Sequence, residues 1–328
     1  MNIASSLRLA AVLLVLTALG APISASAENK NIPVVALFRS TPAAPFAELV
    51  TALRKGLEEE GFAEGRNVRL LLKWADNDRK RLPVIAKELV QGRVAVIVGN
   101  SLAVEASKDA TSAIPIVFVT SDDPIERGLV KTLSRPGSNL TGVTFFGSQL
   151  GAKRLQLLKE LVPGRPIALI LDSNFPASKF EREDIERSAN LSGVNLIVEA
   201  AASGREVQGA IRSAYEQGAG ALLFLASPTF TSHRKAIVEL VRRYRLPAVY
   251  DVRSYVEAGG LMSYAASFVD AYRQAGRYAG RIIHGASPSD LPVLQPAKFK
   301  FTLNLKAARE IGVSIPEWFL VQADDIIE

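Results

Sequence analysis

Hydroxyl, amide and carboxyl side chains collect where the apolar segments of this chain end. In an open α/β sheet the strand ends share one edge, where helix N-termini present free N–H groups and polar ligands bind. Ser, Asn and Asp also cap helices in proteins that hold no ligand there. The sequence therefore predicts a row of polar groups that either bind a small molecule or cap helices: Arg39, Ser40, Asn100, Ser101, Ser121, Asp122, Asn174, Ser227, Thr229 and Asp251.

Aromatic side chains accompany several of these polar groups. Tyr250 ends an expected strand, Phe175 and Phe230 lie in the segments that follow two others, and Phe46 lies at the start of the helix after the first strand. Helix capping gives no reason for aromatic residues at such positions. Flat apolar walls beside a few directed polar groups are typical of small-molecule sites. We therefore expect these aromatic residues to line a ligand cleft.

Residues for catalysis are scarce. The chain has no cysteine and only two histidines, which we expect at a helix start (His233) and at a helix C-terminus (His284). Two isolated histidines build neither a metal site nor a Ser-His-Asp triad. The sequence also lacks the GxxxxGK[ST] and GxGxxG phosphate loops. Asp122 and Asp123 are neighbours whose side chains should point apart after a strand. The pattern favours a binding protein, with no cofactor and no metal, over an enzyme.

The first 27 residues have the pattern of a cleaved export signal. A basic residue, Arg8, precedes an apolar run over 9–19, and the small residues Ala25-Ser26-Ala27 follow. This run is too short for a membrane span, which needs roughly 20 apolar residues. A buried helix or a membrane anchor is the alternative. We expect a signal peptide over residues 1–27, a mature chain from Glu28 and a periplasmic location.

Composition narrows the class further. The 328 residues exceed the usual length of one domain, and 48% of them are hydrophobic, enough for sizeable cores. The formal net charge is +6, but basic and acidic residues interleave, as over 181–187, and form no nucleic-acid stripe. The lack of cysteine excludes disulfides and a lipid-anchored cysteine. We expect two domains in a freely diffusing monomer with no nucleic-acid partner.

Apolar runs alternate with helical patterns along the chain, which indicates α/β architecture. The runs are mostly continuous, as in parallel strands covered on both faces. Two lobes fit this order better than one ten-stranded sheet, with the helix over 267–283 returning to the first lobe. Strands are expected at 32–38, 68–74, 94–98, 114–119, 140–145, 167–171, 195–200, 221–225, 247–250 and 299–303, and helices at 46–57, 177–191, 232–244, 267–283 and the C-terminus.

Several segments together carry a family resemblance. The most specific are Gly259-Gly260-Leu261-Met262-Ser263-Tyr264 and Arg135-Pro136-Gly137-Ser138-Asn139. Weaker matches include Ala44-Pro45-Phe46, Ala271-Tyr272-Arg273-Gln274 and Leu291-Pro292-Val293. Over nearly all of the expected mature chain, the sequence resembles the ABC-transporter substrate-binding proteins of the tryptophan/tyrosine-type group.

The resemblance implies a type I periplasmic-binding-protein fold. Its two Rossmann-like lobes with parallel sheets are joined by three crossing strands and close over a ligand by hinge motion. We expect the crossings near 142–146, 262–266 and 299–303. The first lobe then comprises 28–143 plus 265–297, and the second comprises 144–264 plus 298–328. The implied partners are a small-molecule ligand and the membrane permease of an ABC importer.

The resemblance also suggests how a ligand is held. By analogy with amino-acid binders of that fold, Asn100-Ser101 and Ser121-Asp122 would take a carboxylate, and Asp251 would take an ammonium group. Two departures leave the ligand's identity open. Many relatives carry a carboxylate where this chain has Ser227, and a glycine where it has Ala265.

We therefore interpret the chain as a solute receptor that delivers a small molecule to an ABC importer without chemistry on it. An amino acid or aromatic carboxylate is the expected ligand. A sugar or nucleoside is the alternative, because polar strand ends can also bind hydroxyl groups. Two other functions stay open at this point. One is an exported α/β hydrolase, and the other is a sensory module that presents its ligand to a membrane kinase.

Overall fold

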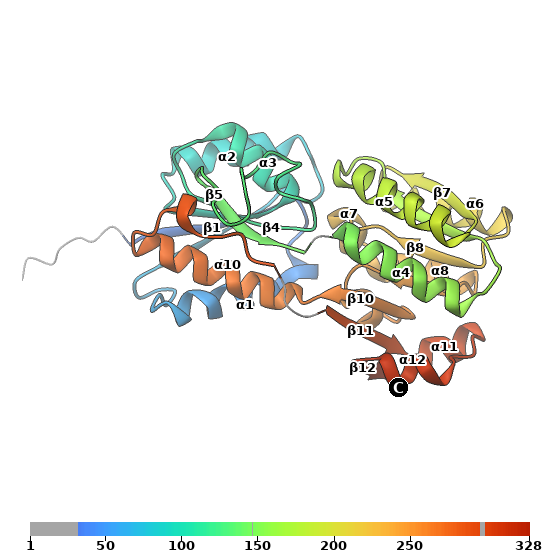
Figure 1. The fold of residues 1–328 in the computed structure, drawn as a ribbon. Coiled ribbons are helices and arrows are strands. Elements are labelled where there is room, and N and C mark those ends of the chain that lie inside the picture. The colour runs from blue at the N-terminus through green and yellow to red at the C-terminus, as the bar shows by residue number, and fades with distance from the viewer. Residues whose placement is uncertain (1–31, 146, 296–298) are drawn as a thin grey trace, which may run out of the picture. The chain divides into compact units, whose positions relative to one another are not determined.

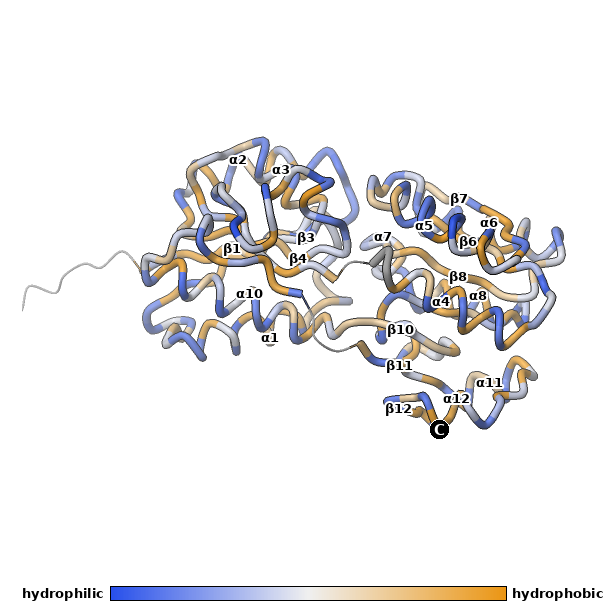
Figure 2. Tube along the Cα trace, in the orientation of Figure 1, coloured by the Kyte–Doolittle hydropathy of each residue, from blue (hydrophilic) through white to orange (hydrophobic). Residues whose placement is uncertain are grey.

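The computed structural model describes residues 32–145, 147–295 and 299–328. They form two β-sheets with helices packed on them (Figure 1). Apolar residues run along the strands of both sheets, and hydrophilic residues recur along the helices (Figure 2). The expected signal peptide and its cleavage site lie outside the described residues.

The first sheet has five parallel strands in the order β2-β1-β3-β4-β5. Helices α1 and α10 pack on one face of this sheet, and α2 and α3 pack on the other. We call this sheet with its helices the first lobe. Its elements are β1 (Val34–Arg39), η1 (Ala44–Phe46), α1 (Ala47–Glu59), β2 (Arg69–Trp74), α2 (Arg81–Gln91), β3 (Val96–Asn100), α3 (Ser101–Ala110), β4 (Ile116–Thr120), β5 (Leu140–Thr144), α10 (Phe268–Ile283) and η2 (Pro288–Asp290).

The second sheet has seven strands in the order β12-β11-β10-β9-β8-β6-β7. Helices α4 and α5 belong to the core on one face, and α6 and α8 to the core on the other. This sheet with its helices is the second lobe. Its elements are α4 (Gly147–Leu161), β6 (Ile167–Asp172), α5 (Ala177–Ser192), β7 (Leu196–Ala201), α6 (Val207–Glu216), β8 (Ala221–Phe224), α7 (Pro228–Ser232), α8 (Arg234–Arg243), β9 (Ala248–Tyr250), α9 (Ser254–Glu257), β10 (Met262–Ala266), β11 (Phe299–Asn304), α11 (Leu305–Ile311), α12 (Glu317–Gln322) and β12 (Asp325–Ile327).

The expected strands are confirmed, with ends that differ by one or two residues. Three details differ from the expectation. The chain ends in a strand, β12, where only a helix was expected. The helix expected over 232–244 is interrupted at His233, because Ser227 and Pro228 start a separate short helix, α7, which ends at Ser232. The second sheet is not wholly parallel, because β11 runs antiparallel to β10.

The chain returns to the first lobe after building most of the second. It leaves the first sheet after β5, comes back after β10 to form α10, and leaves again before β11. Helix α10 begins at a cap, where the Ser267 hydroxyl accepts a hydrogen bond from the Asp270 N–H at 3.1 Å. Its apolar face, which includes Tyr272 and Ala275, then joins the core beneath α1. Two segments far apart in sequence thus share one core (Figure 1).

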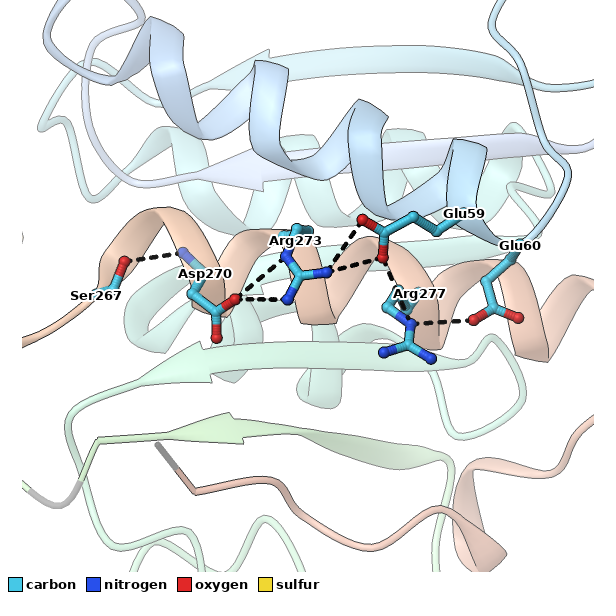
Figure 3. Close-up of polar contacts among 6 residues, drawn as sticks. All are labelled: Glu59, Glu60, Ser267, Asp270, Arg273 and Arg277. Carbon is cyan, nitrogen blue, oxygen red and sulfur yellow. Dashed lines mark hydrogen bonds and ion pairs between the residues drawn. The ribbon is translucent and has the colours of Figure 1, made fainter. Parts of the chain in front are cut away.

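Ion pairs line the exposed side of the α1–α10 contact (Figure 3). Nη1 of Arg273 donates to both carboxylate oxygens of Glu59, at 3.0 and 2.9 Å, and Nε of Arg277 donates to Glu60 at 3.2 Å. Partly exposed pairs of this kind each contribute about 0–1 kcal/mol. The main stabilisation of the helix pair must therefore come from the apolar contact beneath them.

That apolar contact depends on two glycines. A methyl group on Gly276 would overlap the carbonyl oxygen of Leu53, and one on Gly56 would overlap the carbonyl oxygen of Arg273. The backbones of the two helices therefore touch directly, and no side chain larger than hydrogen fits at either crossing position. Close approach of this kind maximises the dispersion contact along both helices.

We expect Gly276→Ala to destabilise the protein by about 1–3 kcal/mol, because the added methyl must push the helices apart. Gly209→Ala is a matched control, since Gly209 lies within α6 and a methyl group there would meet no atom within 4 Å. Alanine at an exposed helical position should instead stabilise by a few tenths to about 1 kcal/mol. Urea unfolding of both variants measures these changes. Equal free energies of unfolding for Gly276→Ala and the natural protein would contradict the close contact.

Candidate functional site

Strand ends of both sheets meet at one small cavity of about 40 Å³, which we call the central cavity. The first lobe contributes residues that follow β1, β3 and β4, and the second contributes residues that follow β6, β8 and β9. Eight of the predicted site residues lie on it: Arg39, Phe46, Asn100, Ser101, Ser121, Phe175, Ser227 and Asp251.

Arg39 supplies a buried positive charge to the central cavity. It ends β1, is only 2% exposed, and makes no ion pair with a carboxylate of the described residues. Nε donates to Thr41 at 3.2 Å, and Nη1 donates to the Tyr272 hydroxyl on α10. The guanidinium group lies over the rings of Phe46 and Tyr272, at 4.2 and 5.3 Å from their centroids. Burial lowers the pKa of Arg39, the direction expected for a cation that lacks a counter-charge.

The N-terminus of α3 opens beside this arginine. Asn100 precedes the helix but does not cap it. Instead its amide group is held by Ser40, because Oδ1 accepts from the Ser40 N–H at 2.9 Å and Nδ2 donates to the Ser40 hydroxyl at 2.8 Å. The Ser101 hydroxyl pairs with Thr120 at 2.7 Å. The first-turn N–H groups of this ten-residue helix therefore have no side-chain cap and carry the positive end of the helix dipole.

Asp251 supplies a buried negative charge from the second lobe. It directly follows β9, is 8% exposed, and its Oδ1 atom has no hydrogen-bond partner in the described structure. The cation that acts on Asp251 is Arg154. Arg154 is already paired with Glu181 at 3.2 Å and donates to the carbonyl oxygen of Tyr264 at 2.9 Å. Burial raises the pKa of Asp251 to about 7, and this rise is reduced by Arg154 and increased by Glu181. Asp251 does not cap α9, which has no side-chain cap.

Two other buried aspartates lie near the central cavity, but their carboxyl groups already have partners in the protein. Asp122 follows β4 and lies 3.8 Å from Nε of Arg127. The two residues line a neighbouring pocket together with residues of α5. Burial raises the pKa of Asp122 to about 7. Asp172, at the end of β6, accepts from the Ser227 hydroxyl at 2.7 Å. Ser227 also caps α7 by accepting from the Phe230 N–H at 3.0 Å, so its hydroxyl both donates and accepts within the second lobe.

The remaining predicted residues lie elsewhere. Ser40, Asn174 and Thr229 line a separate cavity of about 370 Å³, the polar cavity, together with charged side chains such as Arg79, whose guanidinium donates to the carbonyl oxygen of Asn174. Phe230 and Tyr250 are fully buried in the core on the α6–α8 face of the second sheet. Tyr250 stacks there on Tyr255 with ring centroids 4.4 Å apart. The expectation that these two aromatic residues line the central cavity does not hold in this structure.

Six residues on the central cavity escaped the sequence prediction. Three add small or apolar surface, and these are Val119, Ala226 and Pro228. The others are Thr120, which ends β4, Thr231 in α7, and Phe268, the first residue of α10. Thr120 stands directly before the predicted Ser121, so extending the strand end by one residue would have found it. No local pattern points to Phe268, because its place depends on the return of α10 to the first lobe.

A third cavity, of about 310 Å³, adjoins the central one, and we call it the apolar cavity. It shares Phe46, Thr231 and Phe268 with the central cavity. Its further lining comes from α1, from the segment after β9, and from the ends of β10 and β11: Pro45, Glu48, Leu49, Val252, Arg253, Ser254, Glu257, Ala265, Ala266, Ser267, Val269, Lys300 and Thr302.

Hydrogen bonds join the two lobes around these cavities. Nδ2 of Asn77 in the first lobe donates to the Ser232 hydroxyl in the second at 2.9 Å. Nη2 of Arg234 in the second lobe donates to the carbonyl oxygen of Pro45 in the first at 3.2 Å. In this structure the two lobes are therefore in direct contact beside the central cavity, which both of them line.

The described residues contain no group of three or more His, Cys, Asp or Glu side chains that could hold a metal ion. Both histidines contact backbone oxygens: Nδ1 of His233 lies 2.9 Å from Thr229, and Nε2 of His284 lies 2.9 Å from Glu60. Over the same part of the chain, the helices are all too short or too polar to cross a bilayer.

These observations define a two-lobed α/β protein with a small, charged cavity between its lobes. A family model described as "ABC transporter substrate binding protein" matches residues 25–327. The chain therefore belongs to the ABC transporter substrate binding protein family, and it has the type I periplasmic-binding-protein fold.

Individual relatives agree with this assignment. A tyrosine-binding protein from Clostridioides difficile (strain R20291) is 27% identical over 244 residues, which cover 73% of this chain and 69% of the relative. Two solved structures each match 90% of this chain and 99% of their own. One is a conserved domain protein from Vibrio cholerae (26% identity, TM-score 0.84), and the other is an ABC domain in complex with L-Trp from Streptococcus pneumonia (25% identity, TM-score 0.82).

The raised pKa of Asp251 predicts how the ligand-free protein responds to pH. A carboxyl group whose pKa is above its ordinary value favours the folded state while protonated, and this contribution is lost as the pH rises through about 7. Asp251→Asn carries no charge at any pH. We therefore expect the melting temperature of Asp251→Asn to exceed that of the natural protein by at least about 2 °C at pH 8, and by less at pH 5.

Differential scanning calorimetry of ligand-free protein at the two pH values measures this difference. Asp109→Asn, on the exposed side of α3, is the control and should show no comparable change with pH. An Asp251→Asn difference that is the same at pH 5 and pH 8 would rule out a buried, uncompensated carboxylate.

Proposed function

We propose that this protein is the extracytoplasmic receptor of an ABC importer and that its ligand is an amino acid. One observation carries the proposal: a buried guanidinium group and a buried carboxylate, neither matched by a free counter-charge, line the same central cavity. An amino acid is a small molecule that bears both complementary charges on one carbon atom.

The first lobe fits the α-carboxylate. Arg39 offers guanidinium N–H donors, and the uncapped start of α3 offers backbone N–H groups at the positive end of the helix dipole. A carboxylate here would also restore the charge balance around Arg39, whose pKa is lowered by burial. Asn100 and Ser101 are then positioning residues, because their side chains are already bonded within the lobe.

The second lobe fits the α-ammonium group. Oδ1 of Asp251 lacks a partner among the described residues and stands on the same cavity. An ammonium group beside it would favour the ionised carboxylate and lower its pKa. Because one charge contact belongs to each lobe, an amino acid would hold the lobes together, and this supports hinge closure as the binding motion.

Other ligand classes fit less well. A sugar or a nucleoside without ionised groups would leave both buried charges uncompensated, and breaking or lacking one partner of a buried pair costs several kcal/mol. The names of the tyrosine-binding relative and of the L-Trp complex also support an amino acid. We further propose that the chain is not an enzyme, since the family is named for substrate binding.

The wider biological setting follows from the family and is part of the same proposal. The membrane permease of an ABC importer is the partner, residues 1–27 are a cleaved signal peptide, and the mature protein is a periplasmic monomer. We propose lobe boundaries at 28–143 plus 265–297 and at 144–264 plus 298–328. Presentation of the ligand to a membrane kinase is the competing use of the same site, and a neighbouring permease and ATPase in the genome would favour transport.

The proposal predicts that each charge of the ligand is read by one residue. Removing one partner of a desolvated charge pair typically costs roughly 2–5 kcal/mol. We expect Asp251→Asn to weaken binding of L-tryptophan by about 30-fold or more, since about 1.4 kcal/mol corresponds to tenfold. The same variant should bind indole-3-propionate, which lacks the ammonium group, about as well as the natural protein does.

Arg39→Gln should show the opposite selectivity. It should lose affinity for L-tryptophan and for indole-3-propionate, but change little toward tryptamine, which lacks the carboxylate. Isothermal titration calorimetry of the three compounds against both variants and Asp109→Asn measures these differences. If Asp251→Asn binds L-tryptophan as tightly as the natural protein does, the ammonium contact is wrong. If no amino acid binds the natural protein, the ligand class is wrong.

A further inference from the structure

The polar cavity has a charged lining that the proposed function does not use. Both lobes line it, and it shares no residue with the central cavity. The first lobe contributes the segment over 77–79, before α2, and the second contributes residues at and after the ends of β6 and β7. Two arginines and two aspartates line this cavity, so it has no excess charge that would hold an ion. A contact between the lobes is a better account of it than a second ligand site.

The first-lobe side of this cavity has an unusual backbone. Asp76 and Asn77 both adopt the left-handed conformation, with φ angles of 55° and 63°. Asn and Asp enter this region more readily than other residues, but such positions still cost free energy and persist where surrounding contacts hold them. Here β1 supplies the contact, because the Asn77 N–H donates to the carbonyl oxygen of Ser40 at 2.8 Å. The segment over 75–79 is therefore fixed to the end of β1.

Two side chains of this segment contact the second lobe. Nδ2 of Asn77 donates to the Ser232 hydroxyl at 2.9 Å, and the guanidinium group of Arg79 donates to the carbonyl oxygen of Asn174. The direction of the first bond is fixed, because the Ser232 hydroxyl donates its hydrogen to the carbonyl oxygen of Thr229 at 2.6 Å. Ser232 must therefore accept from Asn77, and residue 77 must be a donor.

Arg79 also acts on a buried carboxylate of the second lobe. Burial raises the pKa of Asp172, and its hydrogen bonds and Arg79 reduce this rise. Asp172 is only 2% exposed, but Arg79 is exposed, so solvent screens the attraction between them. The partly buried bond from Asn77 is therefore the more specific of the two contacts.

Both contacts are connected to the central cavity through hydrogen bonds. In the first lobe, Ser40 holds the amide group of Asn100 with bonds of 2.9 and 2.8 Å. In the second lobe, the Asn174 N–H donates to Asp172 at 2.9 Å, and the other carboxylate oxygen accepts from Ser227 at 2.7 Å. Asn100 and Ser227 both line the central cavity. A contact between the lobes at the polar cavity therefore also sets the separation of the two sides of the central cavity.

We propose that the segment over 75–79 is a latch that holds the two lobes in contact from outside the ligand site, with the bond from Asn77 to Ser232 as its main contact. The latch touches no residue of the central cavity directly, so it acts on every ligand in the same way. Its bonds are polar and border a polar cavity, where water can replace them. It is therefore weak enough to open and close repeatedly.

The test reverses the polarity of the main contact. Asn77→Asp keeps the shape of the side chain and suits the left-handed backbone, but it places an oxygen atom opposite a hydroxyl that has no hydrogen to donate. Ser232→Ala removes the acceptor from the other lobe and completes a double-mutant cycle. Asn190→Asp, at an exposed position of α5, is the control with the same change of charge.

The separation of the lobes can be measured directly, because the chain has no cysteine. Lys87→Cys in α2 and Gln208→Cys in α6, both exposed, place one spin label on each lobe. Pulsed electron paramagnetic resonance then gives the distribution of distances between the labels, without ligand and with L-tryptophan. We expect Asn77→Asp and Ser232→Ala each to add a population of inter-lobe distances that the natural protein and Asn190→Asp lack.

The dissociation rate of L-tryptophan, measured by stopped-flow mixing, provides the second readout, and this part of the test rests on the proposed function. We expect either single variant to release L-tryptophan roughly fivefold faster, since a net hydrogen bond of about 1 kcal/mol corresponds to that factor. The double variant should differ little from Asn77→Asp, because the same bond is lost only once.

The outcomes separate the latch from the ligand. A change in either readout that both single variants share and that Asn190→Asp lacks supports the latch. Unchanged distances and rates in Asn77→Asp, or effects of Asn77→Asp and Ser232→Ala that simply add, overturn the latch and leave the amino-acid ligand in place. If L-tryptophan does not bind the natural protein, the proposed function fails, and the ligand-free distances alone decide about the latch. If Asn77→Asp fails to fold, the distances in Ser232→Ala decide.

Discussion

The direct contact between α1 and α10 is the constraint on which the remaining structure depends. It brings a helix that follows the second lobe in sequence into the core of the first lobe. The contact requires hydrogen in place of a side chain at Gly56 and Gly276. Tyr272 lies on the same helix and holds Arg39 through its hydroxyl group. The packing of α10 on α1 therefore also sets the position of the Arg39 guanidinium group. A displacement of α10 would move Arg39 with it.

The charges around the central cavity are balanced within each lobe except at the two positions that line it. Arg154 is paired with Glu181, and Asp122 faces Arg127 at 3.8 Å, while Asp172 accepts a hydrogen bond from Ser227. Arg39 and Asp251 are left without ion-pair partners among the described residues, at a cost to the folded state. A protein that tolerates such a cost at a cavity can recover it when a ligand with both charges binds. Under the proposed function, a bound amino acid would recover this cost and so favour the state in which both lobes contact the ligand.

Much of this arrangement could be predicted from the sequence, because continuous apolar runs define parallel strands and polar residues after them define the sheet edge. What could not be predicted depends on side-chain direction and on distant partners. Tyr250 and Asp251 are adjacent, but alternation along a strand sends Tyr250 into the core and leaves Asp251 at the cavity. Whether Asp251 has a free cation depends on Arg154, which Glu181 of another helix has already engaged. Phe268 lines the cavity only because α10 crosses back.

The order of these segments along the chain also sets when the first lobe can form. Its sheet is complete once β5 has been made, but its core lacks α10 until the ribosome has added the whole second sheet apart from β11 and β12. At typical elongation rates of about 5–20 residues per second, this interval is about 7–28 s. During that time the apolar face that α10 will cover is exposed, and the N-terminal segment cannot settle into its final form. A chain with this connectivity stays incompletely folded through most of its synthesis, which is the state that threading through a membrane pore requires.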